Sequence, residues 1–424
     1  MKKKIVLLLT CIFVTAFLVT GCNGGKEEPP TSVPTAALTP SAEPTQAPTE
    51  EPTATPTEEP TPTPTATPTP LPDVSLKEIY EKHGLKVGTC LNTTMIDNKN
   101  YNKTILNHFT SATMENDMKP DSILSQKQSQ EAGKPVVYFN PSVTKMLKFA
   151  KENNIALRGH TICWYSQTPD WIFREGFENS GDLVGRDEMI SRLEEITKQI
   201  FEKLDELGYL DLFYAYDVCN EALLDDHADT GNLEAMIRPS RWTETIGKDY
   251  LWYAFYFADK YAPESINLFY NDFNEQWKIQ LLLNLIETLK DGDRYLIDGI
   301  GFQAHLYTKD DLDLYFKLVD RLSETGLILE LTELDVCLGK YQSPLIANDD
   351  NLKVQGRFYY DLINGLFERI DNGTLKMDSI TFWGFADGLS WRKEYNPLLY
   401  NRQNKPKYSL YGAAQMKEFA GFDE

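Results

Sequence analysis

Residues 213–221 read Phe-Tyr-Ala-Tyr-Asp-Val-Cys-Asn-Glu, an apolar run that ends in polar residues. Its length and its aromatic content indicate a buried β-strand over Phe213–Asn220, with Glu221 directly after it. Because successive side chains of a strand alternate between its two faces, Asp217, Cys219 and Glu221 share one face. Carboxylates at the C-terminal end of a buried strand are typical of parallel barrels, which carry their active sites at that end.

Seven further runs of this kind occur in the same part of the chain, each bounded by polar residues, Gly or Pro. They are Leu85–Leu91, Phe109–Glu115, Ile155–Ile162, Ile266–Tyr270, Gly299–His305, Leu327–Glu333 and Ser379–Phe385. Segments with helical periodicity lie between them, at Val143–Asn153, Glu188–Leu207, Ile246–Tyr261, Gln276–Lys290, Leu312–Ser323 and Leu352–Glu368. Alternating strands and helices predict a parallel sheet, and eight repeats favour a single (β/α)8 TIM barrel, an α/β fold. No G-x-G-x-x-G segment follows an early strand, so a dinucleotide-binding fold is not indicated.

The N-terminus has the composition of a targeting segment. Three lysines at positions 2–4 precede an apolar run at residues 5–19, which is short for a membrane-spanning helix. Small residues and Cys22 follow, as in the bacterial lipobox. We therefore expect a lipoprotein signal peptide over residues 1–21 and a lipid anchor on Cys22. The alternative is an ordinary signal peptide with a chance cysteine at this position.

Residues 22–72 consist mostly of Pro, Thr, Ala, Ser and Glu. Such a composition has too little apolar surface to fold and favours an extended linker. We expect this linker to hold a barrel domain, residues 73–424, at the outer face of the cell membrane; the alternative is that the protein is secreted. The formal net charge of −21 argues against a nucleic-acid partner, since phosphate binding needs a basic surface.

No C-x-x-C motif occurs among the four cysteines of the predicted barrel, which are Cys90, Cys163, Cys219 and Cys337. A zinc site or a dithiol redox motif is therefore not indicated. All four lie in or just after predicted strands, where a free cysteine packs as a small apolar group. A disulfide between Cys163 and Cys219 is the alternative.

Two glutamates, Glu221 and Glu333, stand at the ends of the fourth and seventh strand runs. In an eight-stranded ring these ends can face each other across a bound sugar. Glycoside hydrolysis uses one protonated and one ionised carboxyl group, and in the retaining mechanism the two are about 5–5.5 Å apart. Glu221 should then have the raised pKa, because it must hold a proton at working pH. Taken alone, such a pair is as consistent with salt bridges at strand ends.

Seven motifs stand at the predicted strand ends. They are Thr113–Pro120, Gly159–Pro169, Asp217–Ala222, Asn271–Asn274, Gly301–His305, Leu331–Val336 and Thr381–Trp391. In type and order they are similar to the motifs of family 10 glycoside hydrolases. The resemblance extends from about Leu76 to Phe419, almost the whole predicted barrel. Each motif alone is weak, but seven in order are specific.

The resemblance implies a retaining endo-β-1,4-xylanase with Glu221 as acid/base and Glu333 as nucleophile. It implies that Asn220 contacts the sugar 2-hydroxyl, and that His305, oriented by Asp335, supports Glu333. It also implies substrate-binding residues: Glu115, Asn116, Lys119, His160, Trp164 and Gln167 on the glycone side, Asn271 near the aglycone side, Gln303, and Trp383 and Trp391 as apolar walls. The expected partner is xylan or a xylo-oligosaccharide, the expected state is a monomer, and no cofactor or metal is expected.

Two positions depart from the family pattern. Tyr165 stands where a histidine is usual, and Phe273 stands where a tyrosine is usual. Both could tune the preferred chain length without touching the two glutamates. The alternatives are an oligosaccharide-preferring xylanase or β-1,4-glucanase of the same family, a surface lipoprotein that binds glycans without cutting them, and a metal-dependent barrel hydrolase.

Overall fold

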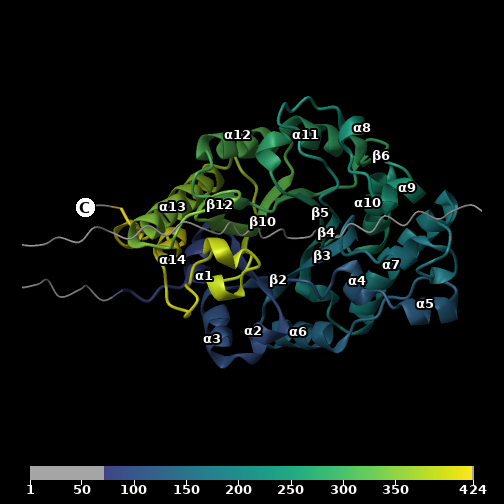
Figure 1. Cartoon of the computed structure of the whole chain (residues 1–424), viewed down its shortest axis with the longest axis horizontal. Coiled ribbons are helices and arrows are strands. Elements are labelled where there is room, and N and C mark those ends of the chain that lie inside the picture. The colour runs from purple at the N-terminus through teal and green to yellow at the C-terminus, as the bar shows by residue number, and fades with distance from the viewer. Residues whose placement is uncertain (1–70, 423–424) are drawn as a thin grey trace, which may run out of the picture. The chain divides into compact units, whose positions relative to one another are not determined.

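Eight parallel strands close into a barrel in the computed structural model, which describes residues 71–422 (Figure 1). In ring order they are β1 (Lys86–Leu91), β2 (Ser111–Met114), β3 (Ala156–Trp164), β4 (Phe213–Asn220), β5 (Asn267–Asp272), β8 (Gly299–Phe302), β10 (Ile328–Cys337) and β13 (Ser379–Phe382). The ring closes because β13 pairs in parallel with both β1 and β10. The prediction of a single TIM barrel is thus confirmed. The predicted signal peptide, Cys22 and the linker up to residue 70 lie outside the described residues.

The main helices follow the strands as the periodicity predicts. They are α6 (Pro141–Glu152), α7 (Arg186–Glu206), α10 (Tyr250–Tyr261), α11 (Ile279–Thr288), α12 (Leu312–Ser323) and α13 (Asp349–Asp371). The predicted helix Ile246–Tyr261 is shorter than expected because Gly247, with φ +110°, separates α10 from α9 (Arg241–Thr245). In the described part of the chain, no helix is long and apolar enough to span a membrane.

Shorter elements decorate the barrel. The helices are α1 (Leu76–Tyr80), α2 (Thr93–Asp97), α3 (Lys99–His108), α4 (Pro120–Ile123), α5 (Gln126–Ala132), α8 (Leu233–Met236) and α14 (Tyr408–Ala413). Two hairpins pair β6 (Lys290–Asp291) with β7 (Arg294–Tyr295), and β11 (Gly339–Lys340) with β12 (Ser343–Pro344). The first hairpin precedes β8, whereas the second follows β10 and so extends from the C-terminal end of the barrel.

The sixth strand run is divided in two. The sequence predicts one strand over Gly299–His305, but β8 ends at Phe302 and a second strand, β9 (His305–Tyr307), begins after Ala304. Ala304 has φ +54°, a left-handed conformation that breaks the extended backbone. β9 pairs with β10, and His305 is the register partner of Asp335. The break therefore turns His305 towards the seventh strand.

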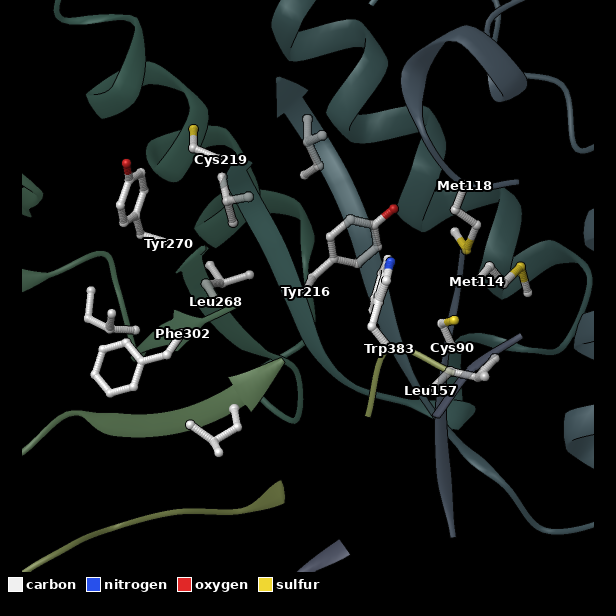
Figure 2. Close-up of a cluster of buried hydrophobic side chains, with 14 of the residues drawn as sticks. Cys90, Met114, Met118, Leu157, Tyr216, Cys219, Leu268, Tyr270, Phe302 and Trp383 are labelled. Atoms are coloured by element: carbon white, nitrogen blue, oxygen red, sulfur yellow. The ribbon is translucent and has the colours of Figure 1, made fainter. Parts of the chain in front are cut away.

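Buried apolar side chains from neighbouring strands form the core. Figure 2 shows Leu157 of β3, Tyr216 and Cys219 of β4, Tyr270 of β5 and Phe302 of β8 among the members of this cluster. The four cysteines of the barrel are buried free thiols, as expected, and the alternative disulfide between Cys163 and Cys219 is absent, although the two residues are register partners on β3 and β4.

Candidate active site

The two glutamates lie at the C-terminal ends of the fourth and seventh strands of the ring. Glu221 directly follows β4 and has φ +53°, and its backbone N–H donates to the carbonyl of Asn271 at 2.9 Å. The Arg238 guanidinium donates to the carbonyls of Glu221 and Leu223, each at 2.9 Å. These bonds fix a backbone conformation that non-glycine residues rarely adopt. Glu333 lies within β10 itself, so both carboxyl groups stand on well-held backbone.

Three amide side chains join the two glutamates. Nε2 of Gln303 donates to Oε1 of Glu221 at 3.0 Å, and Nδ2 of Asn220 lies 3.2 Å from the same oxygen. Nδ2 of Asn271 donates to Oδ1 of Asn220 and to Oε1 of Glu333, each at 2.9 Å. All five side chains are at least nine-tenths buried. Residues that are far apart in the sequence therefore form one hydrogen-bonded group.

The surroundings of Glu221 favour its protonated form. Burial raises the pKa of this carboxyl, and the negative charges of Asp272 and Glu333 raise it further, while the hydrogen bond from Gln303 opposes the shift. The direction agrees with the expectation for the group that must hold a proton. Burial and neighbouring carboxylates are the usual means by which proteins produce a general acid near neutral pH.

Glu333 is held in the ionised state. Although burial opposes it, the contact with His305 and the positive charges around the site lower the pKa of Glu333. Nε2 of His305 lies 3.4 Å from Oε2 of Glu333, and Nδ1 lies 3.2 Å from Oδ2 of Asp335. Asp335 in turn accepts a hydrogen bond of 2.6 Å from Nη1 of Arg392. Positive and negative groups thus alternate in space, in the order Arg392, Asp335, His305 and Glu333.

Asn271 and Gln303, both expected among the substrate-binding residues, each contact one of the two glutamates. The sequence places Asn271 near the aglycone side, but its side chain is fully buried. Its amide nitrogen is shared by Asn220 and Glu333, and its Oδ1 accepts from Oγ1 of Thr332 at 2.6 Å. Asn271 therefore links Asn220, Glu333 and Thr332 through hydrogen bonds. Gln303, expected among the substrate-binding residues, contacts Glu221 directly.

Residues from β2 and β3 form a polar group on the other side of the barrel mouth. Nζ of Lys119 donates to Oδ1 of Asn116 at 2.9 Å and to Oε1 of Gln167 at 3.0 Å. The same ammonium lies 4.8 Å from the centre of the Trp164 ring. Glu115 accepts a hydrogen bond of 2.8 Å from Nδ2 of Asn92. The predicted glycone residues therefore gather in one place, with donors and acceptors suited to sugar hydroxyls.

His160 is oriented from inside the barrel. Its Nδ1 lies 2.9 Å from Oδ2 of Asp217, which also accepts two hydrogen bonds from the guanidinium of Arg158. Nε of Arg158 donates to Glu330 at 2.7 Å. All four side chains are buried. His160 thus joins a buried charge cluster on one side, and its ring lies 5.8 Å from that of Trp383 on the other.

The two tryptophans expected as apolar walls differ in exposure. Trp383 is 6% exposed, whereas Trp391 is 62% exposed, with its ring centre 5.2 Å from that of His305. Tyr165, at the position where the family pattern has histidine, lies under the Arg238 guanidinium at 4.6 Å. Burial and then the charge of Glu221 raise the pKa of the Tyr165 phenol. It therefore stays protonated beside the candidate acid.

Sequence reasoning missed four supporting residues. Each donates a hydrogen bond to a site residue: Asn92 to Glu115, Thr332 to Asn271, Arg158 to Asp217, and Arg392 to Asp335. Each lies within or next to a recognised strand or motif, so its position was a usable signal. Its partner, however, comes from another strand and is visible only in space. Among residues 71–422, no group of three or more His, Cys, Asp or Glu side chains is placed to hold a metal ion.

The family model described as glycosyl hydrolase family 10 matches residues 75–416. A bifunctional endo-1,4-beta-xylanase of Ruminococcus flavefaciens is 35% identical over 344 residues, which are 78% of this chain and 33% of that protein. Endo-1,4-beta-xylanase A of Caldicellulosiruptor saccharolyticus is 30% identical, over 80% of this chain and 95% of that protein. The chain spans about a third to a half of the length of the first three curated relatives.

Among solved structures, a two-module fragment of the Clostridium thermocellum endo-1,4-beta-D-xylanase 10B, complexed with xylohexaose, superimposes with a TM-score of 0.72. It is 30% identical, and the match covers 80% of this chain and 67% of that one. The endo-1,4-beta-xylanase of Caldicellulosiruptor owensensis is 31% identical, with a TM-score of 0.67, over 80% of this chain and 99% of that one.

Proposed function

We propose, because the chain belongs to glycosyl hydrolase family 10, that it is a retaining endo-β-1,4-xylanase which cuts internal bonds of xylan. The observation behind the proposal is that the pKa values of two carboxyl groups, linked by hydrogen-bonded amides, shift in opposite directions. Burial raises the pKa of Glu221, and positive neighbours lower that of Glu333. Similar proteins named endo-1,4-beta-xylanase, and one bound to xylohexaose, support xylan as the substrate.

In the first step, a carboxylate oxygen of Glu333 attacks the anomeric carbon of the glycone sugar. The glycosidic C–O bond breaks as Glu221 gives its proton to the leaving oxygen, and the aglycone departs as an alcohol. His305 and Asn271 hold Glu333 ionised and aimed for this attack. Asn220, whose Nδ2 lies 3.2 Å from Oε1 of Glu221, would bond the sugar 2-hydroxyl, a contact that strengthens in the transition state.

In the second step, ionised Glu221 takes a proton from water, and the water oxygen attacks the anomeric carbon. The ester bond to Glu333 breaks, and the sugar leaves with its original anomeric configuration. Gln303 serves this half of the cycle, because its N–H stabilises the Glu221 carboxylate by a hydrogen bond. Glu221 returns to its protonated form, so the cycle needs no external acid.

The decisive experiment combines product analysis with removal of the nucleophile. NMR of xylohexaose hydrolysis reports bond position and anomeric outcome together, and we expect internal cleavage with a β-anomer first. Glu333→Ala should abolish turnover while the protein still binds xylan. Unchanged turnover in this variant would overturn the mechanism, and binding without turnover in the wild-type protein would indicate a glycan-capturing lipoprotein. Faster hydrolysis of carboxymethylcellulose than of xylan would indicate a β-glucanase.

The lipobox-like sequence at Cys22 supports a further proposal, namely that a lipid on this cysteine anchors a monomeric enzyme at the outer face of the membrane. The Pro/Thr-rich linker would then give the barrel access to insoluble polysaccharide. Labelling cells with a radioactive fatty acid tests the anchor. Cys22→Ala should remove the label and release the protein into the medium, whereas label that survives this substitution would exclude Cys22 as the anchor.

A further inference from the structure

Two backbone N–H groups that follow β4 donate to the end of β5. That of Glu221 donates to the carbonyl of Asn271 at 2.9 Å, and that of Leu223 donates to Oη of Tyr270 at 3.1 Å. The Tyr270 hydroxyl, which belongs to the core cluster of Figure 2, donates in turn to the carboxylate of Asp272. Tyr270 and Asp272 are fully buried. A carboxylate on β5 thus fixes, through one phenol, the backbone that follows the candidate acid.

A buried lysine makes the third link between these two segments. Nζ of Lys278 lies 2.8 Å from Oδ1 of Asp272 and 3.1 Å from Oδ1 of Asp225. Nδ2 of Asn274 donates to Oδ2 of Asp225 at 3.2 Å. The side chains of Lys278 and Asp272 are 0% exposed, whereas that of Asp225 is 32% exposed. We call Asp225, Lys278 and Asp272 the lysine clamp, because one ammonium joins the loop after β4 to the end of β5.

The ammonium of the lysine clamp is charged. Although burial favours the neutral amine, the carboxylates of Asp272 and Asp225 raise the pKa of Lys278 above its usual value. Separation of such a buried pair would leave an uncompensated charge in the protein interior, which is far costlier than opening an ion pair on the surface. The lysine clamp is therefore a stiff link.

Glu221 depends on support of this kind. Its backbone has φ +53°, so the direction of its side chain is set by the contacts of its own segment. A general acid must lie within hydrogen-bond reach of the leaving oxygen, and a displacement of about 1 Å can reduce the rate on the order of 100-fold. The links from residues 221, 223 and 225 to β5 and to Lys278 all belong to the segment that begins with the acid.

We propose that Lys278 is a positioning residue for the acid/base: through Asp225 and Asp272 it holds the segment after β4 so that the Glu221 carboxyl reaches the leaving oxygen. This inference rests on the proposed function, because that function assigns proton donation to Glu221. Since its side chain is fully buried, Lys278 acts through Glu221 and not on the sugar itself. Its contribution should therefore appear in bond cleavage that needs a proton.

The test uses two leaving groups that differ in their need for a proton. Phenolate is the stronger base and leaves with help from an acid, whereas 2,4-dinitrophenolate leaves without it. The quantity compared is kcat/KM, which reports the first displacement, for phenyl and for 2,4-dinitrophenyl β-xylobioside. Asp225→Ala should lower the phenyl value about tenfold and leave the dinitrophenyl value within about twofold of the wild type. Hydrolysis of xylan, whose leaving group is a sugar alcohol, should fall with the phenyl value.

Asp226→Ala is the matched control, because it changes the neighbouring carboxylate of the same loop. Asp226 accepts from the N–H groups of Ala228 at 3.2 Å and of Thr230 at 2.7 Å. The variant therefore loosens the loop but leaves the lysine clamp in place. Its ratio of the phenyl to the dinitrophenyl value should stay as in the wild type.

Lys278→Met removes both ion pairs at once. It should lower the same ratio at least as far as Asp225→Ala does. The double variant Asp225→Ala/Lys278→Met should fall no further than Lys278→Met alone, since the two residues form one link. If Lys278→Met does not fold, Asp225→Ala decides the question, because it keeps the buried pair of Lys278 and Asp272.

The outcomes separate the two proposals. A wild-type protein that hydrolyses neither xylan nor the xylobiosides overturns the proposed function. An active wild-type protein whose ratio is unchanged in Asp225→Ala overturns the positioning role alone. An equal fall of kcat/KM on both xylobiosides overturns it too, because a general loss of fold or of substrate binding affects both leaving groups alike. A fall confined to xylan and the phenyl xylobioside, absent from Asp226→Ala, supports it.

Discussion

Nε2 of His305 lies 3.4 Å from Oε2 of Glu333, which places a titratable cation beside the candidate nucleophile. Although burial alone would lower it, the charges of Asp335 and Glu333 raise the pKa of His305 to about 9. The imidazole is therefore positively charged at neutral pH. The ion pair between this imidazole and Glu333 stabilises both the ionised carboxylate and the folded protein.

This coupling predicts a pH-dependent stability. Because the folded pKa of His305 is about 9 and its ordinary value is 6.5, its stabilising effect is fully present below pH 6.5 and is lost as the pH rises through about 9. His305→Gln should therefore reduce the free energy of unfolding at pH 6 and have a much smaller effect at pH 9.5. Urea unfolding of both proteins across this range measures the difference. An equal loss at every pH would show that the histidine acts only by packing.

Gln303 should influence the alkaline limit of activity through the pKa of Glu221. Its N–H bonds the Glu221 carboxyl at 3.0 Å and favours the ionised form, so removal of this amide raises the pKa of Glu221 further. In Gln303→Leu the alkaline limb of the kcat/KM profile should move to higher pH, with a lower kcat because a smaller fraction of Glu221 is in the ionised form that the second step needs. Gln199→Leu, on the outer helix α7, is the control. A shift to lower pH contradicts the assignment of Glu221 as the acid.

Thr332 should act on the rate through Asn271. Its hydroxyl donates to Oδ1 of Asn271 at 2.6 Å and so fixes which end of that amide faces Glu333. Thr332→Val keeps the shape but removes a bond of about 1 kcal/mol, and kcat should fall roughly fivefold or more. Thr197→Val removes a comparable buried bond, from its hydroxyl to the carbonyl of Leu193 in α7. Both variants should lose similar stability, but only Thr332→Val should lose rate.

The sequence predicts strands well because each strand run is short, buried and bounded by polar residues. Phe213–Asn220 is reproduced to the residue, and Leu312–Ser323 is reproduced among the helices. The break at Ala304 is not visible in the pattern, since an alanine carries no signal for positive φ. Local periodicity reports which face of an element is buried, but it does not report a turn imposed by a neighbouring strand.

Glu221 and Glu333 could be predicted as site residues because each is a carboxylate in a motif at a predicted strand end. A role that depends on a partner from another strand could not be predicted. The resemblance predicts Asn271 near the aglycone side, but its hydrogen bond to Glu333 is visible only in the structure. Such relationships exist only after the barrel closes.

The buried cluster inside the barrel yields the last prediction. Arg158 is 1% exposed and pairs with Asp217 and Glu330, which are equally buried. Removal of one member of a buried ion cluster leaves uncompensated charge and costs about 3–5 kcal/mol. Arg158→Met should therefore strongly reduce the free energy of unfolding, as measured by urea denaturation at pH 7. It should also lower kcat, because Asp217 positions His160.

The exposed pair of Arg186 and Asp249 gives the matched control, with both side chains more than 40% exposed. Solvent screens such a pair, so Arg186→Met should cost no more than about 1 kcal/mol. If Arg158→Met proves as mild as this control, the buried charges must be satisfied by protonation of Glu330, whose pKa burial already raises to about 7. In that event the variant should be less stable at pH 8.5 than at pH 6, because the carboxyl must then ionise without its partner.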